Sequence, residues 1–124
     1  MIKRISTDKA PAAIGPYSQA LDTGNMLFIS GQIPIDPATG TMPETVEAQA
    51  KQVLTNIQNI LAEAGLTMAN VVKTSVFLSD LGDFAAVNEV YASFFKEPYP
   101  ARSCVQVAAI PKGAKVEIET IAVK

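Results

Sequence analysis

Apolar residues recur along this chain with two different periods. Between residues 44 and 64 they return at steps of three and four, as on one face of an α-helix. They are Val46, Ala50, Val53, Leu54, Ile57, Leu61 and Ala64. Pro43 and Glu44 suit the first turn, and Gly65 occupies the place where helices often end in a left-handed residue. The spacing therefore predicts a long helix over residues 44–64.

A second helix is predicted over residues 83–95. It ends ahead of Pro98, because proline disfavours the helical conformation in the residue before it. Its expected buried residues are Phe84, Val87, Tyr91, Phe94 and Phe95.

Six further segments carry the alternation or the short apolar runs that are typical of β-strands. They are residues 1–6, 17–21, 26–30, 71–78, 103–110 and 115–123. The order of elements predicts an α+β domain in which two helices pack on one face of a six-stranded mixed sheet. No internal repeat or linker divides residues 1–124, so we expect a single domain.

Alternation also assigns faces to two of these strands. In residues 71–78 one face is expected to hold Val72, Thr74, Val76 and Leu78. In residues 115–123 the apolar face is expected to hold Val116, Ile118, Thr120 and Ala122. Glu117 lies on the opposite face with Ile121 and Val123, so part of that face must be covered. With both helices on the other side, we expect the cover to be another subunit.

Composition and charge exclude several function classes. The formal net charge of the 124 residues is -2 and no basic stripe occurs, so the electrostatic footprint of nucleic-acid binding is missing. No apolar run approaches the ~20 residues of a membrane span, and the N-terminus lacks the apolar core of a signal peptide. The single cysteine suits a reducing compartment, so we expect a cytoplasmic protein without membrane or nucleic-acid partners.

The absence of histidine removes much of the usual catalytic chemistry. It excludes Ser-His-Asp and Cys-His couples and His-ligated zinc, while a single cysteine excludes a four-thiolate metal site. Neither of the common glycine-rich phosphate-binding motifs occurs. Acid–base work must therefore come from a carboxylate, a tyrosine, a lysine, the cysteine or a bound water.

Two charged residues occupy unusual places. Arg102 is one of only two arginines, and it precedes the strand predicted over residues 103–110. A guanidinium grips a carboxylate through two parallel hydrogen bonds, so Arg102 could anchor a small organic acid. A solvated arginine, or one in a surface ion pair, is the simpler alternative. Glu117, between two apolar residues, could hold and activate a water or could simply face solvent.

Several blocks of the sequence resemble the RidA family, also called YjgF/YER057c/UK114. They are Ala13-Ile14-Gly15-Pro16-Tyr17-Ser18, Ser30-Gly31-Gln32-Ile33-Pro34, Val87-Asn88-Glu89-Val90-Tyr91, Pro100-Ala101-Arg102-Ser103-Cys104-Val105 and Val116-Glu117-Ile118-Glu119. The blocks occur in the family's order from about residue 9 to residue 123. The spacing from Arg102 to Glu117 makes the resemblance specific and points to the deaminase-type branch.

This resemblance implies a chorismate-mutase-like fold and a homotrimer with three ligand clefts between neighbouring subunits. It also implies hydrolysis of 2-imino acids, the tautomers of enamines such as 2-aminoacrylate and 2-aminocrotonate, to 2-oxoacids and ammonia. Dehydratases that depend on pyridoxal phosphate release these enamines. No cofactor and no metal is expected.

The candidate residues fit this chemistry. Arg102 would grip the substrate carboxylate, and Glu117 would orient and deprotonate a water that attacks the imine carbon. Main-chain groups of Gly31 and Cys104 would hold the plane of the substrate, and the missing side chain of Gly31 would allow its close approach. Tyr17 would close the cleft, or would simply pack half-buried against its neighbours.

Three further assignments compete with simpler interpretations. Ser30 and Asn88 are candidate binding residues, but each could instead satisfy backbone groups. Cys104 is expected to be a small lining residue, because no histidine is present to activate its thiol as a nucleophile. Two other functions also remain open: a regulatory module that binds 2-oxoacids without turnover, and an endoribonuclease, which the missing basic patch disfavours.

The distance between Arg102 and Glu117 depends on how the last two strands pair. In a simple hairpin Glu117 would pair near Ala108, and Arg102 would lie roughly 20 Å away. One chain could not then bring both residues onto one small acid. Either another strand separates them, or neighbouring subunits share the site.

Overall fold

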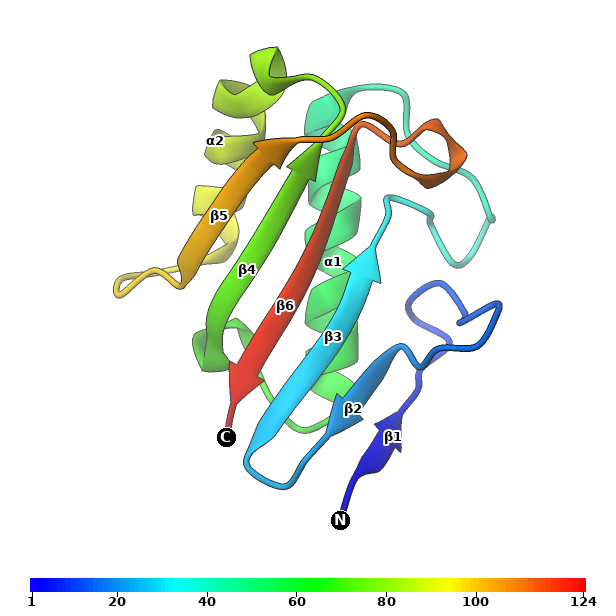
Figure 1. Ribbon diagram of the computed structural model, residues 1–124, viewed down its shortest axis with the longest axis vertical. Helices are drawn as coiled ribbons and strands as arrows, with labels where there is room; N and C mark the ends of the chain where they lie inside the picture. Colours follow the sequence, from blue (N-terminus) through cyan, green and yellow to red (C-terminus); the bar gives the residue numbers. More distant parts are fainter.

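The computed structural model describes residues 1–124, and its six strands form one mixed sheet (Figure 1). The strands are β1 (Lys3–Ile5), β2 (Ala20–Asp22), β3 (Met26–Gln32), β4 (Val71–Leu78), β5 (Ala101–Gln106) and β6 (Val116–Val123). They lie in the order β1-β2-β3-β6-β4-β5. Neighbouring strands are antiparallel except β4 and β5, which are parallel. The predicted six-stranded mixed sheet is confirmed.

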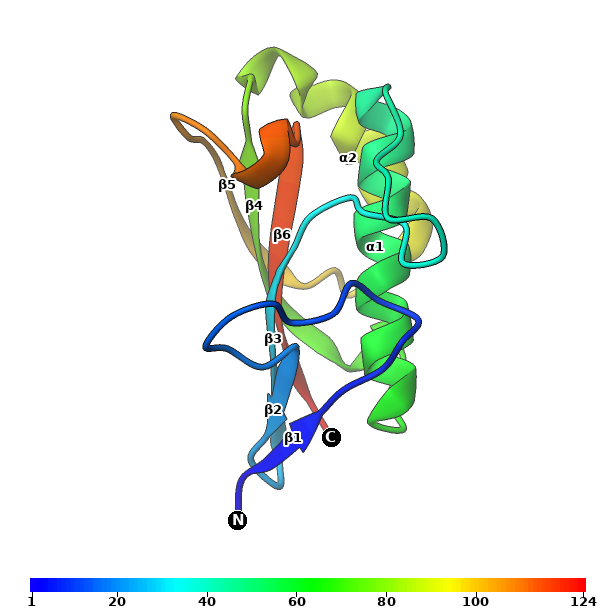
Figure 2. The ribbon, with the colours of Figure 1, turned by 90° about the vertical axis from the view of Figure 1, so that its right-hand side faces the viewer.

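Two helices, α1 (Val46–Glu63) and α2 (Phe84–Phe94), pack on one face of the sheet (Figure 2). We call this side the helix face. The other side, the open face, carries no helix and includes Ser75, Phe77, Glu117, Glu119 and Ile121. Short 3-10 helices lie at Met68–Asn70, Leu81–Asp83 and Pro111–Gly113. The arrangement confirms the predicted α+β class, and neither helix is long and apolar enough to cross a membrane.

Helix α1 begins and ends where the sequence supplies capping groups. The Thr45 side chain accepts a hydrogen bond from the Ala48 N–H at the N-terminus. At the other end Gly65 adopts a φ of 77°, and its N–H bonds the Ala62 carbonyl. The predicted apolar face is buried from Val46 to Leu61. Three residues that were not predicted, Gln49, Asn56 and Ile60, are buried with it.

A β-bulge near the start of β4 corrects the predicted faces. Val71 pairs with Ala122 and Lys73 with Ile121, so three residues of β4 oppose two of β6. Val71 is therefore buried and Val72 is exposed, the reverse of the simple alternation. From Thr74 onwards the predicted faces of this strand are confirmed.

Other boundaries differ for local reasons. β2 covers only three residues instead of residues 17–21. β5 ends at Gln106 rather than at residue 110, because its only partner, β4, ends at Leu78 opposite that residue. Phe84 was expected to be buried but is 39% exposed, since it is the first residue of α2 and lies near the edge strand β5.

The last two strands do not form a hairpin. β4 lies between β5 and β6 and pairs with both, so another strand separates Arg102 from Glu117. This was one of the two alternatives considered for this pair. Arg102 aligns with Thr74 of β4, whereas Glu117 aligns with Phe77, three positions further along the same strand.

A buried amide fastens the long segment between β1 and β2. Gln19 Nε2 donates to the carbonyls of Thr7, Ala10 and Pro11, and its Oε1 accepts from the Thr7 N–H. A segment without regular structure forms few backbone–backbone hydrogen bonds, so the Gln19 amide serves as the hydrogen-bond partner of four of its backbone groups. Gln19 thus fixes the chain just ahead of Tyr17.

Two amides of α1 do the same for segments at the other end of the sheet. Gln49 Oε1 accepts a hydrogen bond from the Lys115 N–H, one residue before β6. Asn56 Nδ2 donates to the carbonyls of Ile33 and Ile35, directly after β3. These two side chains therefore hold both segments at one end of the β3–β6 pair, the segment that leaves β3 and the segment that enters β6.

Replacing Asn56 by leucine is expected to lower the free energy of unfolding by about 2–4 kcal/mol, because two carbonyls lose their donor inside the protein. The two side chains are similar in size, so packing changes little. Asn59→Leu is the control, since Asn59 is only half-buried and its amide donates one hydrogen bond, to the Lys9 carbonyl. Urea denaturation followed by circular dichroism measures both. Equal losses would show that the Asn56 bonds carry no special weight.

Candidate functional site

Arg102 lies on the helix face of the edge strand β5, against α2. Its Nη1 donates a 2.7 Å hydrogen bond to Asn88 Oδ1. The guanidinium carbon lies 5.5 Å from the centroid of the Phe84 ring and 4.8 Å from that of the Tyr91 ring. These three residues of α2 are spaced at i, i+4 and i+7, so they form one stripe of the helix. One helix face therefore holds the guanidinium.

No carboxylate of the chain neutralises Arg102. The one ion pair in the structure joins Lys124 to Asp22, far from β5 in the sheet. Only the N–H group bonded to Asn88 has a protein partner, so the rest of the fork is free to bind a ligand. Of the two simpler alternatives, a surface ion pair and a solvated arginine, the ion pair does not occur within this chain.

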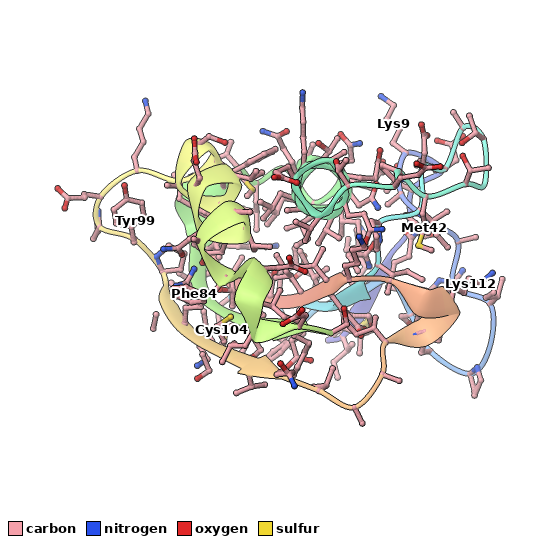
Figure 3. The ribbon with its side chains drawn as sticks, turned by 90° about the horizontal axis from the view of Figure 1, so that it is seen from above. Lys9, Met42, Phe84, Tyr99, Cys104 and Lys112 are labelled. Carbon is pink, nitrogen blue, oxygen red and sulfur yellow. The ribbon has the colours of Figure 1, made fainter.

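Cys104 lies two residues further along β5 and shares the face of Arg102 (Figure 3). The view shows Cys104 and Phe84 together in the layer between β5 and α2. Burial raises the pKa of the Cys104 thiol, and the charge of Arg102 offsets this only in part. At neutral pH the side chain is therefore a thiol, which suits a lining residue better than a nucleophile.

Glu117 lies on the open face of β6. Its neighbours Val116 and Ile118 are fully buried on the helix face, so the alternation of the strand turns Glu117 the other way. Burial raises the pKa of the Glu117 carboxyl group, and the charge of Glu119 raises it further. Glu117 is thus half-buried and has no cation to stabilise its charge, in contrast to a solvated surface glutamate.

Gly31 of β3 makes room for this carboxyl group. A Cβ atom built at Gly31 would overlap with Glu117 Oε2 and lie 3.0 Å from Glu117 Cδ. The backbone of Gly31 is not in the left-handed region, so the glycine is required for space rather than for conformation. The space that was expected to admit a substrate is filled by Glu117 in this structure.

Tyr17 and Ser30 lie along the open face, and Ser30 directly precedes Gly31 in β3. They line a hollow of about 670 Å³, together with Leu21, Phe28 and Ile121 among others. The Ser30 hydroxyl donates a 2.6 Å hydrogen bond to the Ser18 carbonyl, so it satisfies a backbone group, the alternative weighed for this residue. Tyr17 is about half exposed and its hydroxyl has no hydrogen-bond partner.

The candidate residues thus fall into two groups on opposite faces of the sheet. The arginine half-site consists of Phe84, Asn88, Tyr91, Arg102 and Cys104. The glutamate half-site consists of Gly31 and Glu117, which are in contact, together with Tyr17 and Ser30, which line the hollow on the same open face. Within one chain the sheet itself lies between them, so a single chain does not bring Arg102 and Glu117 to one small ligand.

Comparison with known proteins places this arrangement in a family. The family model described as Endoribonuclease L-PSP matches residues 7–124. The chain belongs to this family, the RidA (YjgF) family. The family resemblance found in the sequence blocks is therefore confirmed.

Relatives match over their whole length. The chain is 55% identical to a 2-iminobutanoate/2-iminopropanoate deaminase of Escherichia coli, over 100% of this chain and 99% of the relative. The crystal structure of RidA from the Antarctic bacterium Psychrobacter superposes with a TM-score of 0.96 at 53% identity, covering 98% of this chain and 99% of that one. The crystal structure of Escherichia coli TdcF with bound serine gives 0.95 at 53% identity, covering 98% of each chain.

Sequence reasoning missed two members of the arginine half-site. Phe84 and Tyr91 were predicted only as buried residues of α2, but both rings contact the Arg102 guanidinium. Their spacing around Asn88 was the available signal, because residues at i, i+4 and i+7 share one helix face. That face meets β5 only through the packing of α2 on the sheet, which the local sequence does not specify.

Gly31→Ala is expected to abolish most of the activity of the protein while leaving its stability nearly unchanged. The new methyl group meets the end of a flexible side chain, so the Glu117 carboxyl group moves and the backbone stays. The loss should approach that of Glu117→Ala, and the double variant should be no worse than either single one. Activity and thermal unfolding are measured together. A fully active Gly31→Ala protein would show that this position of Glu117 is not needed.

Proposed function

We propose that this RidA family member hydrolyses 2-imino acids, formed from enamines such as 2-aminoacrylate and 2-aminocrotonate, to 2-oxoacids and ammonia. Its 55% identical relative is named 2-iminobutanoate/2-iminopropanoate deaminase. The observation that carries the proposal is the pair of half-sites: an unneutralised guanidinium fork and a half-buried carboxyl group with a raised pKa. The first suits a carboxylate ligand, and the second suits a group that both accepts and returns a proton.

The reaction needs little more than positioning and one proton relay. Arg102 grips the substrate carboxylate, and Glu117 takes a proton from a water whose oxygen bonds to the imine carbon. The same carboxyl group returns that proton to the nitrogen. In the resulting carbinolamine the carboxylate takes the hydroxyl proton and passes it to the amino nitrogen, the carbon–nitrogen bond breaks, the carbonyl forms and ammonia leaves. A carboxyl group with a raised pKa can both accept and return the proton, as this sequence requires.

Tyr17, Ser30, Gly31, Asn88 and Cys104 keep supporting roles in this proposal. The main chains of Gly31 and Cys104 line the substrate, and Tyr17 closes the cleft. Ser30 and Asn88 hold neighbouring groups in place, through their hydrogen bonds to the Ser18 carbonyl and to Arg102.

We further propose that the complete site forms between subunits of a homotrimer. Opposite faces of one sheet cannot contact the same small acid, whereas the open face of one subunit can meet the β5 edge of the next. The open face is also partly apolar, with Leu21, Phe28 and Val105 each more than a third exposed. Burying such a surface stabilises an oligomer.

The decisive assay couples the protein to a pyridoxal-phosphate-dependent threonine dehydratase. We expect catalytic amounts of the protein to raise the rate of 2-oxobutanoate release above the spontaneous rate. Arg102→Lys keeps the charge but loses the planar fork, so activity should fall strongly. Glu117→Gln should lose hydrolysis while it still binds 2-oxobutanoate, and Cys104→Ala should keep substantial activity. Equal rates with and without the wild-type protein would instead support a binding module without turnover.

Mixed oligomers test the shared site. Arg102→Ala and Glu117→Ala proteins are each expected to be inactive. Co-refolding them one to one should restore about one quarter of the wild-type rate, because a site is intact only when one subunit provides Arg102 and its neighbour provides Glu117, each with a probability of about one half. The control mixes each inactive variant with itself under the same conditions. A mixture that stays inactive although it forms mixed oligomers would place both residues in a site made by one chain.

A further inference from the structure

A buried hydrogen bond beneath Arg102 joins helix α2 to the centre of the sheet. The Tyr91 hydroxyl and Thr74 Oγ1 lie 2.7 Å apart, and the two residues are only 5% and 1% exposed. Thr74 is also the register partner of Arg102 in the neighbouring strand β4. The Tyr91 hydroxyl is therefore tied to the same row of the sheet from which Arg102 extends.

This bond fixes the ring on which the guanidinium lies. Phe95 packs against Tyr91 with a centroid distance of 4.6 Å and an interplanar angle of 37°. The guanidinium carbon of Arg102 lies 4.8 Å from the centroid of the same ring. Tyr91 is thus held by a second aromatic ring and by its hydroxyl, and a planar cation in contact with a ring is oriented by that ring.

The contact to Asn88 alone would leave Arg102 underdetermined. One hydrogen bond, from Nη1 to Asn88 Oδ1, fixes a point of the fork but permits rotation about that bond. Two-point binding of a carboxylate requires the plane of the fork to be set as well. In this structure the ring of Tyr91 is the buried, doubly anchored surface that can set it.

We propose that Tyr91 and Thr74 are positioning residues, whose mutual hydrogen bond sets the plane of the Arg102 guanidinium and thereby its affinity for the carboxylate of a 2-imino or 2-oxo acid. The proposal deepens the proposed function and rests on it for the identity of the ligand. Neither residue touches the reacting atoms. Their removal should therefore weaken binding and leave the chemical step nearly unchanged.

Thr120 provides a matched control on the same face of the sheet. It is the register partner of Thr74 in β6, it is 2% exposed, and its Oγ1 has no hydrogen-bond partner. Thr120→Val therefore removes a hydroxyl at the same depth without touching the Tyr91–Thr74 bond.

The test measures the affinity for 2-oxobutanoate by calorimetry, together with KM and kcat in the coupled dehydratase assay. Tyr91→Phe and Thr74→Val should each weaken binding and raise KM by about threefold to tenfold, the value of one hydrogen bond, with kcat changed less than about twofold. Thr74→Ser keeps the hydroxyl and should bind as the wild type does. Thr120→Val should also leave the affinity unchanged.

Two further variants separate positioning from general damage to the core. The double variant Tyr91→Phe/Thr74→Val leaves no unpaired hydroxyl, and it should lose no more affinity than either single variant. In an Arg102→Lys background Tyr91→Phe should have no further effect, because an ammonium group has no plane to be set. Circular dichroism and thermal unfolding establish that each variant is folded.

Several outcomes would overturn the proposal. They are unchanged affinity in Tyr91→Phe, an equal loss in Thr120→Val, and an undiminished Tyr91→Phe effect in the Arg102→Lys background. Failure of the proposed function has a different signature: the wild type would then not accelerate 2-oxobutanoate release, while the affinity series would still test the role of Tyr91.

Discussion

The burial of alternate residues of β6 determines where the two half-sites lie. Val116 and Ile118 fill the core on the helix face, and a strand has a side-chain period of two, so Glu117 must face the other way. The pairing of β4 with β5 sets the direction of Arg102. Thr74 of β4 is buried on the helix face, and register partners in neighbouring strands share a face, so Arg102 faces α2. A slip of one residue between β4 and β5 would move Arg102 to the open face and away from α2.

The segments that carry the glutamate half-site depend on polar side chains rather than on apolar packing. Tyr17 lies in a segment held by Gln19, and the chain after Gly31 is held by Asn56. Their amides replace the ladder hydrogen bonds that strands would supply. Such bonds are directional, so they fix the position of a backbone more closely than apolar contacts can. This precision matters at Gly31, where the Glu117 carboxyl group leaves no room for a methyl group.

Local patterns predicted the elements well and left the pairing of the strands open. The apolar residues of α1 recur every three or four positions because one side of the helix is buried, and this spacing can be read without knowing what the helix packs against. The neighbours of β6 depend instead on contacts far apart in the sequence, so the sequence left two alternatives open for Arg102 and Glu117, and the structure shows that β4 lies between β5 and β6. The bulge at Val71–Lys73 has no local signal either. The motifs identified Arg102 and Glu117 as candidates, but only the fold shows that they lie on opposite faces.

Separation on two faces also has an electrostatic consequence. Because Arg102 and Glu117 lie on opposite faces, they cannot form an ion pair within one chain, which would occupy donors of the guanidinium and lower the pKa of the carboxyl group. In the folded chain neither residue has an oppositely charged partner. In the proposed seam between subunits, a small acid enters between them: its carboxylate neutralises Arg102, and its electrophilic carbon faces Glu117. The substrate itself then keeps the two charges apart, so binding preserves the proton affinity on which hydrolysis depends.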